Sequence, residues 1–80
     1  MIKYDFDRKV LVYDSENVEE ISYSLEHKHM IVRFTNATSY VYFSIPDQVF
    51  AILVSSESVG VALRQLITDF PDIYRYERID

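Results

Sequence analysis

Two tyrosines, Tyr40 and Tyr42, stand two positions apart in the segment SYVYF, residues 39–43. In a β-strand, side chains two positions apart point to the same face, so we expect both phenol rings on one face of a sheet. Such a pair can stack nucleic-acid bases, at about 1–3 kcal/mol per base, or form a docking patch for a protein. In a competing interpretation, the N-terminal segment folds over the rings and they only fill the interior. In a third, that segment pairs with a second copy of the chain.

Several other side chains would extend this tyrosine surface. Arg33 and His29 are expected to flank the two rings, and Arg64 would add a cation for a nucleic-acid ligand. Tyr74 and Tyr76 alternate with charged residues in the tail IYRYERI, which forms either a strip for a basic protein partner or an edge strand kept soluble by its charges. The candidate binding surface is His29, Arg33, Tyr40, Tyr42, Arg64, Tyr74 and Tyr76.

Catalytic and metal-binding chemistry has weak support in the sequence. His27 and His29 lie in a predicted hairpin turn with no third ligand nearby, which is typical of a solvated turn rather than a metal site. None of the serines has the flanking glycines of a nucleophile elbow. Glu19 and Glu20 are adjacent in a predicted strand, so their carboxylates are expected on opposite faces. We therefore expect no enzyme, no cofactor and no metal.

Alternating apolar and polar residues predict the strands that must position these side chains. Near the N-terminus, Ile2, Tyr4 and Phe6 alternate with polar residues, and the segment DRK would turn the chain into a second short strand, VLVY. Three more strands are predicted at 18–24, 29–34 and 39–44, joined by LEHK and TNAT. Because such short connections join antiparallel neighbours, these strands form a meander.

The length of each hairpin loop decides which face a side chain takes. A two-residue loop at residues 36–37 would place Val41 opposite Val32, and a hairpin centred on residues 26–27 would place Ile21 opposite Val32 as well. The face toward the helices is then expected to hold Ile21, Tyr23, Met30, Val32, Val41 and Phe43. The opposite face is expected to hold Glu20, Ser22, Ser24, Ile31, Arg33, Tyr40 and Tyr42.

Helical periodicity replaces the strand pattern after residue 44. Ser44 is a candidate N-cap with an acidic residue three positions later, and Pro46 fits a first helical turn. A second helix is expected from about Ser58 until Pro71 ends it. Its inward residues are expected to be Val59, Leu63, Leu66 and Phe70. The predicted fold class is α+β: an antiparallel β-meander of three strands plus an N-terminal strand or hairpin, with two C-terminal helices packed on one face.

The central segment FTNATSYVYFSIP resembles the KTSC domain. The residues that carry the resemblance are Ile21, Ser22, Tyr23, Phe34, Asn36, Tyr40, Tyr42, Ile45, Pro46, Ser58 and Gly60. The resemblance covers residues 17–79 and divides the chain into an N-terminal β extension, 1–16, and a KTSC-like domain, 17–80. Ser22 and Ala37 stand where the family pattern has Gly, Val59 where it has Lys, and Arg64 where it has Asn.

The resemblance implies a short module found at the C-terminus of some lysyl-tRNA synthetases and as stand-alone bacterial and phage proteins. The synthetase association suggests RNA binding, although Val59 removes the cation of the family pattern. Ala37 would be strained in the primed turn of a two-residue hairpin loop, by roughly 1 kcal/mol.

Composition narrows the class of protein further. The chain has 80 residues, no Cys, 8 Lys and Arg against 13 Asp and Glu, and a formal net charge of -5. Stability must therefore come from a packed core without disulfides, and the negative charge disfavours a phosphate backbone as partner. The longest apolar run, VFAILV, is too short to span a bilayer, and polar residues interrupt any signal sequence. We expect a cytoplasmic protein with no membrane partner.

These observations lead to one expected function and one alternative. The expected function is a small non-catalytic interaction module that binds a protein partner, or itself as a homodimer, through the outer sheet face. The alternative is RNA or single-stranded nucleic-acid binding through the Tyr-x-Tyr strand.

Overall fold

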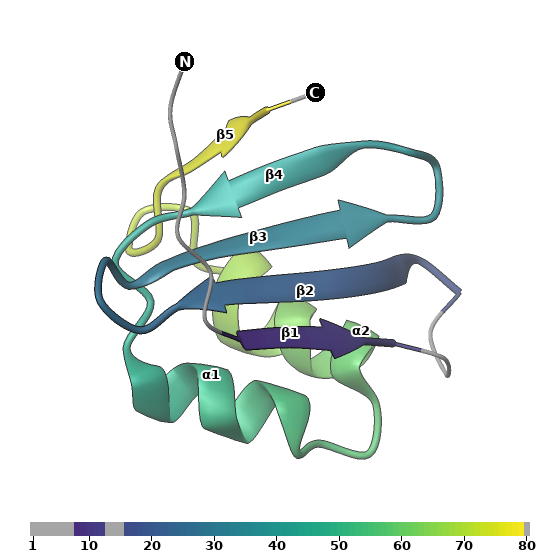
Figure 1. The fold of residues 1–80 in the computed structure, drawn as a ribbon, viewed down its shortest axis with the longest axis horizontal. Helices are drawn as coiled ribbons and strands as arrows, with labels where there is room; N and C mark the ends of the chain where they lie inside the picture. The colour runs from purple at the N-terminus through teal and green to yellow at the C-terminus, as the bar shows by residue number, and fades with distance from the viewer. Residues whose placement is uncertain (1–7, 13–15, 80) are drawn as a thin grey trace.

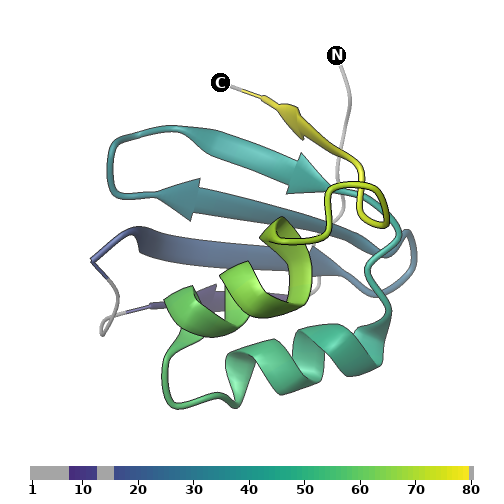
Figure 2. The ribbon, with the colours of Figure 1, turned by 180° about the vertical axis from the view of Figure 1, so that it is seen from behind.

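The computed structural model describes residues 8–12 and 16–79, which form one antiparallel sheet with helices on one of its faces (Figures 1 and 2). The order of strands across the sheet, β1-β2-β3-β4-β5, follows their order along the chain. The elements are β1 (Arg8–Leu11), β2 (Val18–Ser24), β3 (His29–Phe34), β4 (Ser39–Tyr42), α1 (Asp47–Val54), α2 (Val59–Leu63), the π-helix η1 (Arg64–Thr68) and β5 (Tyr76–Arg78). The α+β prediction is confirmed, and the tail supplies the edge strand β5.

The N-terminal strand differs from its prediction. Arg8 and Lys9 do not form a turn; they belong to β1, which pairs with β2 so that Val10 lies opposite Ile21. The predicted strand through Ile2, Tyr4 and Phe6 lies outside the described residues. The division of the chain at residue 16 therefore stays a prediction.

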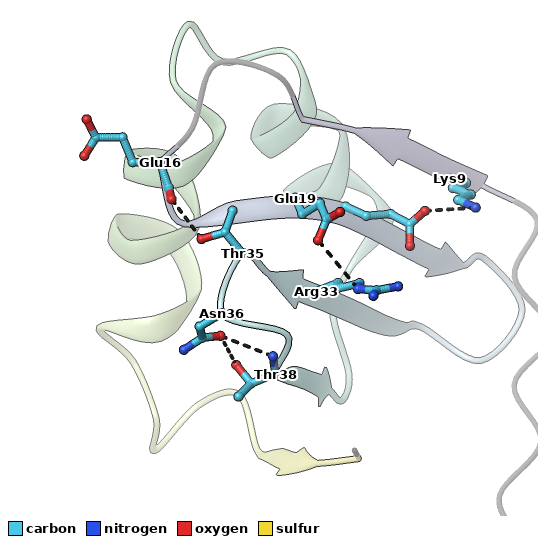
Figure 3. Close-up of polar contacts among 8 residues, drawn as sticks. Lys9, Glu16, Glu19, Arg33, Thr35, Asn36 and Thr38 are labelled. Atoms are coloured by element: carbon cyan, nitrogen blue, oxygen red, sulfur yellow. Dashed lines mark hydrogen bonds and ion pairs between the residues drawn. The ribbon is translucent and has the colours of Figure 1, made fainter.

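The pairing of β2 with β3 agrees with the sequence pattern except at one bulge. Ile21 lies opposite Val32, as the hairpin centred on residues 26–27 requires. The register shifts between Val18 and Glu20, and the bulge changes the direction of the adjacent carboxylates. Glu19 Oε2 lies 3.6 Å from Arg33 Nε and Glu20 Oε1 lies 2.9 Å from Lys9 Nζ (Figure 3). The prediction that these two carboxylates point to opposite faces is wrong, because the bulge lets both reach cations of the face away from the helices.

The register of β3 and β4 also differs from its prediction. The Phe34 amide donates to the Thr38 carbonyl (2.8 Å), and the Ala37 amide donates to the Phe34 carbonyl (3.1 Å), so the loop contains three residues rather than two. Ala37 takes the left-handed conformation that closes such a loop, with φ 69°. Figure 3 shows the Asn36 side chain across this loop, accepting from the Thr38 hydroxyl (2.6 Å) and amide (3.2 Å).

The extra loop residue moves every β4 side chain to the other face, because strand side chains alternate with period two. Tyr42 lies opposite Met30 and Tyr40 opposite Val32, so both tyrosines are on the helix side. The prediction that Tyr40 and Tyr42 point away from the helices is wrong, as is the prediction that Val41 and Phe43 point toward them. Val41 is fully buried on the face away from the helices.

The core lies between the sheet and the helices. Tyr23 stacks on Phe50 of α1 with ring centroids 4.4 Å apart, and its hydroxyl donates to the Ile45 carbonyl (2.6 Å). The prediction of Ser44 as N-cap is wrong: Pro46 occupies the cap position, and Ser44 has φ 59°. The buried members of the core are Val12, Val18, Ile21, Tyr23, Met30, Val32, Tyr42, Ile45, Phe50, Leu53, Val59, Ala62, Leu63 and Ile67.

The second helix changes its winding partway along. Ser58 caps α2 as predicted, with its Oγ accepting from the Val61 amide (3.4 Å). After Leu63 the chain winds as a π-helix, which takes more residues per turn and so changes which side chains face the sheet. Ile67 is buried, whereas Phe70, predicted to point inward, is 45% exposed.

Candidate binding site

The structure brings together the tyrosines of the predicted surface, but not Arg33 or His29. Tyr40 and Tyr42 meet Tyr74 and Tyr76 on the helix side of the β4–β5 edge. Arg33 lies on the opposite face, where it is paired with Glu19. The predicted surface is therefore divided between the two faces of the sheet.

The ring contacts follow from the pairing of β4 with β5. Tyr42 lies opposite Tyr76 in the two strands, and their ring centroids are 5.8 Å apart. The Tyr76 ring also contacts Tyr40 at 5.9 Å, and Tyr40 contacts Phe34 at 5.9 Å, edge to face. Exposure falls steeply across this row, from 51% at Tyr76 to 5% at Tyr42. Aromatic pairs at these separations stabilise each other, so the row forms one wall of a pocket.

This wall and the turn after η1 enclose a pocket of about 300 Å³. We call it the aromatic pocket; its lining residues are Phe34, Tyr40, Tyr42, Ile67, Thr68, Pro71, Tyr74 and Tyr76. Sequence reasoning did not assign Ile67, Thr68 or Pro71 to the site. The sequence indicates Pro71 only as the residue that ends the second helix. Ile67 lines the pocket because η1 turns its side chain toward the sheet.

A second pocket, of about 350 Å³, adjoins the first, because Phe34 and Thr68 line both. We call the two pockets together the groove. Arg64, the first residue of η1, lines this second pocket together with Ser58 and Gly60, and Glu16 lines it as well. The groove thus holds five of the residues that carry the family resemblance: Phe34, Tyr40, Tyr42, Ser58 and Gly60.

Tyr42 has an unusual environment for a tyrosine. Burial, with smaller contributions from the neighbouring Tyr40 and Tyr76, raises the pKa of its phenol to about 12. Within the described part of the chain its hydroxyl makes no hydrogen bond, whereas the hydroxyl of Tyr23, which is also buried, has the Ile45 carbonyl as partner. A buried tyrosine hydroxyl usually has a partner, so Tyr42 differs from the purely structural case.

His29 lies on the other side of the sheet from the aromatic pocket. Its ring stacks near His27 (5.8 Å) and meets Phe43 edge to face (5.1 Å). Burial lowers the pKa of His29, and the neighbouring His27 lowers it further. Arg75 lies over the same Phe43 ring, 5.7 Å from its centroid. His29 therefore belongs to a separate ring cluster rather than to the tyrosine site.

Residues 8–12 and 16–79 contain neither a cluster of metal ligands nor a helix that could span a membrane. No three side chains among the His, Asp and Glu of these residues lie close enough together to hold a metal ion. No helix of this part is both long and apolar enough to cross a bilayer.

Known proteins resemble this chain in both sequence and fold. The model of the KTSC domain matches residues 14–70. An uncharacterised protein of Stutzerimonas stutzeri is 29% identical over 72 residues, which cover 90% of this chain and 99% of the relative. A protein of Tsukamurella paurometabola is 32% identical over 47 residues, covering 59% of this chain and 70% of the relative. The crystal structure of a KTSC domain protein from Yersinia pestis superposes with a TM-score of 0.80 at 18% identity, covering 91% of this chain and 97% of that one.

Proposed function

The chain belongs to the KTSC domain family, and we propose that it is a non-catalytic interaction module that binds an extended segment of a partner protein in the groove. The observation that carries the proposal is the aromatic pocket, with Tyr40 and Tyr76 on its accessible side and the buried Tyr42 at its inner end. Tyrosine is enriched at interfaces because its ring offers a large apolar surface with a polar tip. The groove replaces the outer sheet face as the binding surface, because the tyrosines lie on the helix side.

Depth and length favour an extended peptide over a flat protein surface. The two pockets of the groove are neighbours that share Phe34 and Thr68, so one extended ligand is long enough to reach both. A flat partner would contact only the accessible rings. An extended segment can place successive side chains in successive pockets, which is how peptide-binding domains obtain specificity.

Selection from a phage-displayed library of random linear peptides tests this proposal. The intact chain should enrich peptides whose binding is lost in Tyr76→Ala, which removes the accessible ring of the pocket. The matched control is Ile52→Ala, which removes an equally exposed apolar side chain on α1, outside the groove. Failure to enrich any peptide, or equal binding by Tyr76→Ala, would refute the proposal.

Nucleic-acid binding is the second candidate, favoured by the exposed Tyr76 ring beside Tyr40 and by Arg78 opposite Tyr40 in β5. The net charge of -5 and the pairing of Arg33 with Glu19 oppose it. Oligouridine binding that falls steeply between about 50 and 200 mM salt would support it. A homodimer that uses the same pocket would appear as a concentration-dependent mass in sedimentation equilibrium.

A further inference from the structure

The Tyr42 hydroxyl is a hydrogen-bond donor for which the described residues supply no acceptor. The Tyr42 side chain is only 5% exposed and lines the aromatic pocket. Its hydroxyl has no hydrogen-bond partner in residues 8–12 and 16–79. A buried hydroxyl without a partner is costly, so native structures rarely keep one unless a ligand or water completes it. A ligand carbonyl in the pocket would supply the acceptor.

The polar side-chain groups that the described residues place around the aromatic pocket are all hydroxyls. They belong to Tyr40, Tyr42, Tyr74, Tyr76 and Thr68, and the Thr68 hydroxyl already donates to the Arg64 carbonyl (3.4 Å). Among residues 8–12 and 16–79, no carboxylate, amide or cationic side chain lines this pocket. Phenol hydroxyls can donate to a ligand without needing any donor in return. The pocket therefore fits a ligand that is rich in acceptors, poor in donors and apolar on its surface.

A proline-rich peptide has these properties. Proline lacks the backbone N–H, and the polyproline II helix makes no internal hydrogen bonds, so all its carbonyls are available as acceptors. Proline rings pack against aromatic side chains, and aromatic-lined grooves are the known receptors of this conformation. The ordering cost is small because the peptide is already extended before it binds.

The charged residues near the two ends of the aromatic pocket favour one orientation of a bound basic peptide. Asp69 and Asp72 flank Pro71, and both are exposed at that end of the aromatic pocket. Arg78 lies opposite Tyr40, at the β5 end. The whole chain carries a net charge of -5. Arg75 is also near Pro71, but its guanidinium lies over the Phe43 ring and does not line the aromatic pocket. A basic residue in the peptide is therefore favoured near Pro71 rather than near β5.

We propose that the groove binds a proline-rich peptide in the polyproline II conformation, with a basic residue at the Pro71 end. The inference rests on the proposed function, since it names the class of peptide that the module would take. The Tyr42 hydroxyl donates to a peptide carbonyl, and the rings of Tyr40 and Tyr76 pack against proline.

Titration of the intact chain with synthetic peptides, followed by amide chemical shifts, tests the inference. Decaproline is the probe; as a polyproline II helix it spans about 31 Å, against 31 Å for the longest dimension of the protein, so it can cross the whole groove. A Gly-Ser decapeptide is the length-matched control. Decaproline should saturate the shifts of pocket residues, and the Gly-Ser peptide should not. Absence of saturation by decaproline, or equal binding of both peptides, would overturn the inference.

Two variants separate the ring contact from the hydroxyl contact. Tyr42→Phe keeps the ring and removes only the hydroxyl, and it should weaken decaproline binding about two- to tenfold. Tyr76→Ala changes a half-exposed side chain, so it leaves the core intact, and it should weaken binding by a similar factor. Ile52→Ala should bind as the wild type does. Unchanged affinity in both tyrosine variants would contradict the proposed pose.

Charged probes test the preference for a basic peptide. Octaproline with two arginines should bind more tightly than octaproline with two glutamates at low salt, and the difference should shrink as salt screens Asp69 and Asp72. The reverse order would overturn the charge assignment. If the phage selection enriches groove-dependent peptides that lack proline, the module function stands and this inference fails. If it enriches nothing and decaproline does not bind, both fail.

Discussion

Replacing Ala37 by Gly should stabilise the protein, because this alanine is held in the left-handed region. Its φ of 69° closes the three-residue loop between β3 and β4. A residue with a Cβ pays about 1–2 kcal/mol in this conformation. Glycine avoids that cost but loses more backbone entropy on folding, by roughly 0.5–1 kcal/mol. The expected net gain in the free energy of unfolding is about 0.5–1 kcal/mol.

The matched control is the same substitution in a helix. Ala51 is exposed within α1, so Ala51→Gly should destabilise the protein by about 1 kcal/mol. Urea denaturation followed by circular dichroism measures both changes, with an unchanged slope as the sign that the unfolded state is comparable. For a domain of this size, the loop variant should melt about 2–8 °C higher. If Ala37→Gly lowers the stability, or both glycine variants shift it in the same direction, the assignment of left-handed strain is refuted.

Three further predictions concern the core and its phenols. Burial raises the pKa of Tyr42 to about 12, against the ordinary 10.0, so the folded state favours the neutral phenol. The stability that this shift supplies is complete below pH 10 and is lost as the pH rises toward 12, by about 2–3 kcal/mol. Denaturant titrations at pH 9 and pH 11.5 should therefore show a smaller loss of stability at the higher pH in Tyr42→Phe than in the wild type. Equal losses in the two proteins would contradict the shift. Tyr23→Phe removes the donor to the Ile45 carbonyl and should cost about 1–3 kcal/mol in urea denaturation; a neutral result would mean that the bond contributes nothing net. Leu53→Ala empties a fully buried position and should cost about 2–5 kcal/mol, enough to collapse the dispersion of the amide spectrum, whereas Ile52→Ala next to it should retain that dispersion.

The strands and the first hairpin were predictable because their patterns allow one phase only. In β2, apolar Ile21 and Tyr23 alternate with polar residues, and β3 places Met30 and Val32 opposite them. A slip by one residue would expose all of these side chains, so the pattern fixes the register. The bounds of both strands agree with their prediction for this reason.

The phase of β4 could not be read from its residues. Tyr40, Val41, Tyr42 and Phe43 are all apolar or aromatic, so either face of the strand is suited to burial. The loop length decides between the two, and it depends on Ala37 accepting a conformation that alanine usually avoids. Propensity alone therefore favoured the wrong register.

The same ambiguity affects the second helix. Leu63, Leu66 and Phe70 follow α-helical spacing, but Ile67 is apolar too, and the π-helix selects it. The clustering of Tyr40 and Tyr42 with the tail tyrosines was predictable from strand pairing at the edge. The pocket was not, because its other wall depends on how η1 ends.

The outermost strand has an energetic consequence for any ligand. β5 has only three residues, and all three are exposed, so fraying it sacrifices little buried surface. Yet Tyr76, whose ring lines one side of the aromatic pocket, belongs to this strand. A molecule that binds Tyr76 must also hold β5 against β4, so part of its binding free energy is spent on ordering residues 76–78. Slower amide deuterium uptake in residues 76–78 would accompany occupancy, even if no atom of the sheet moved.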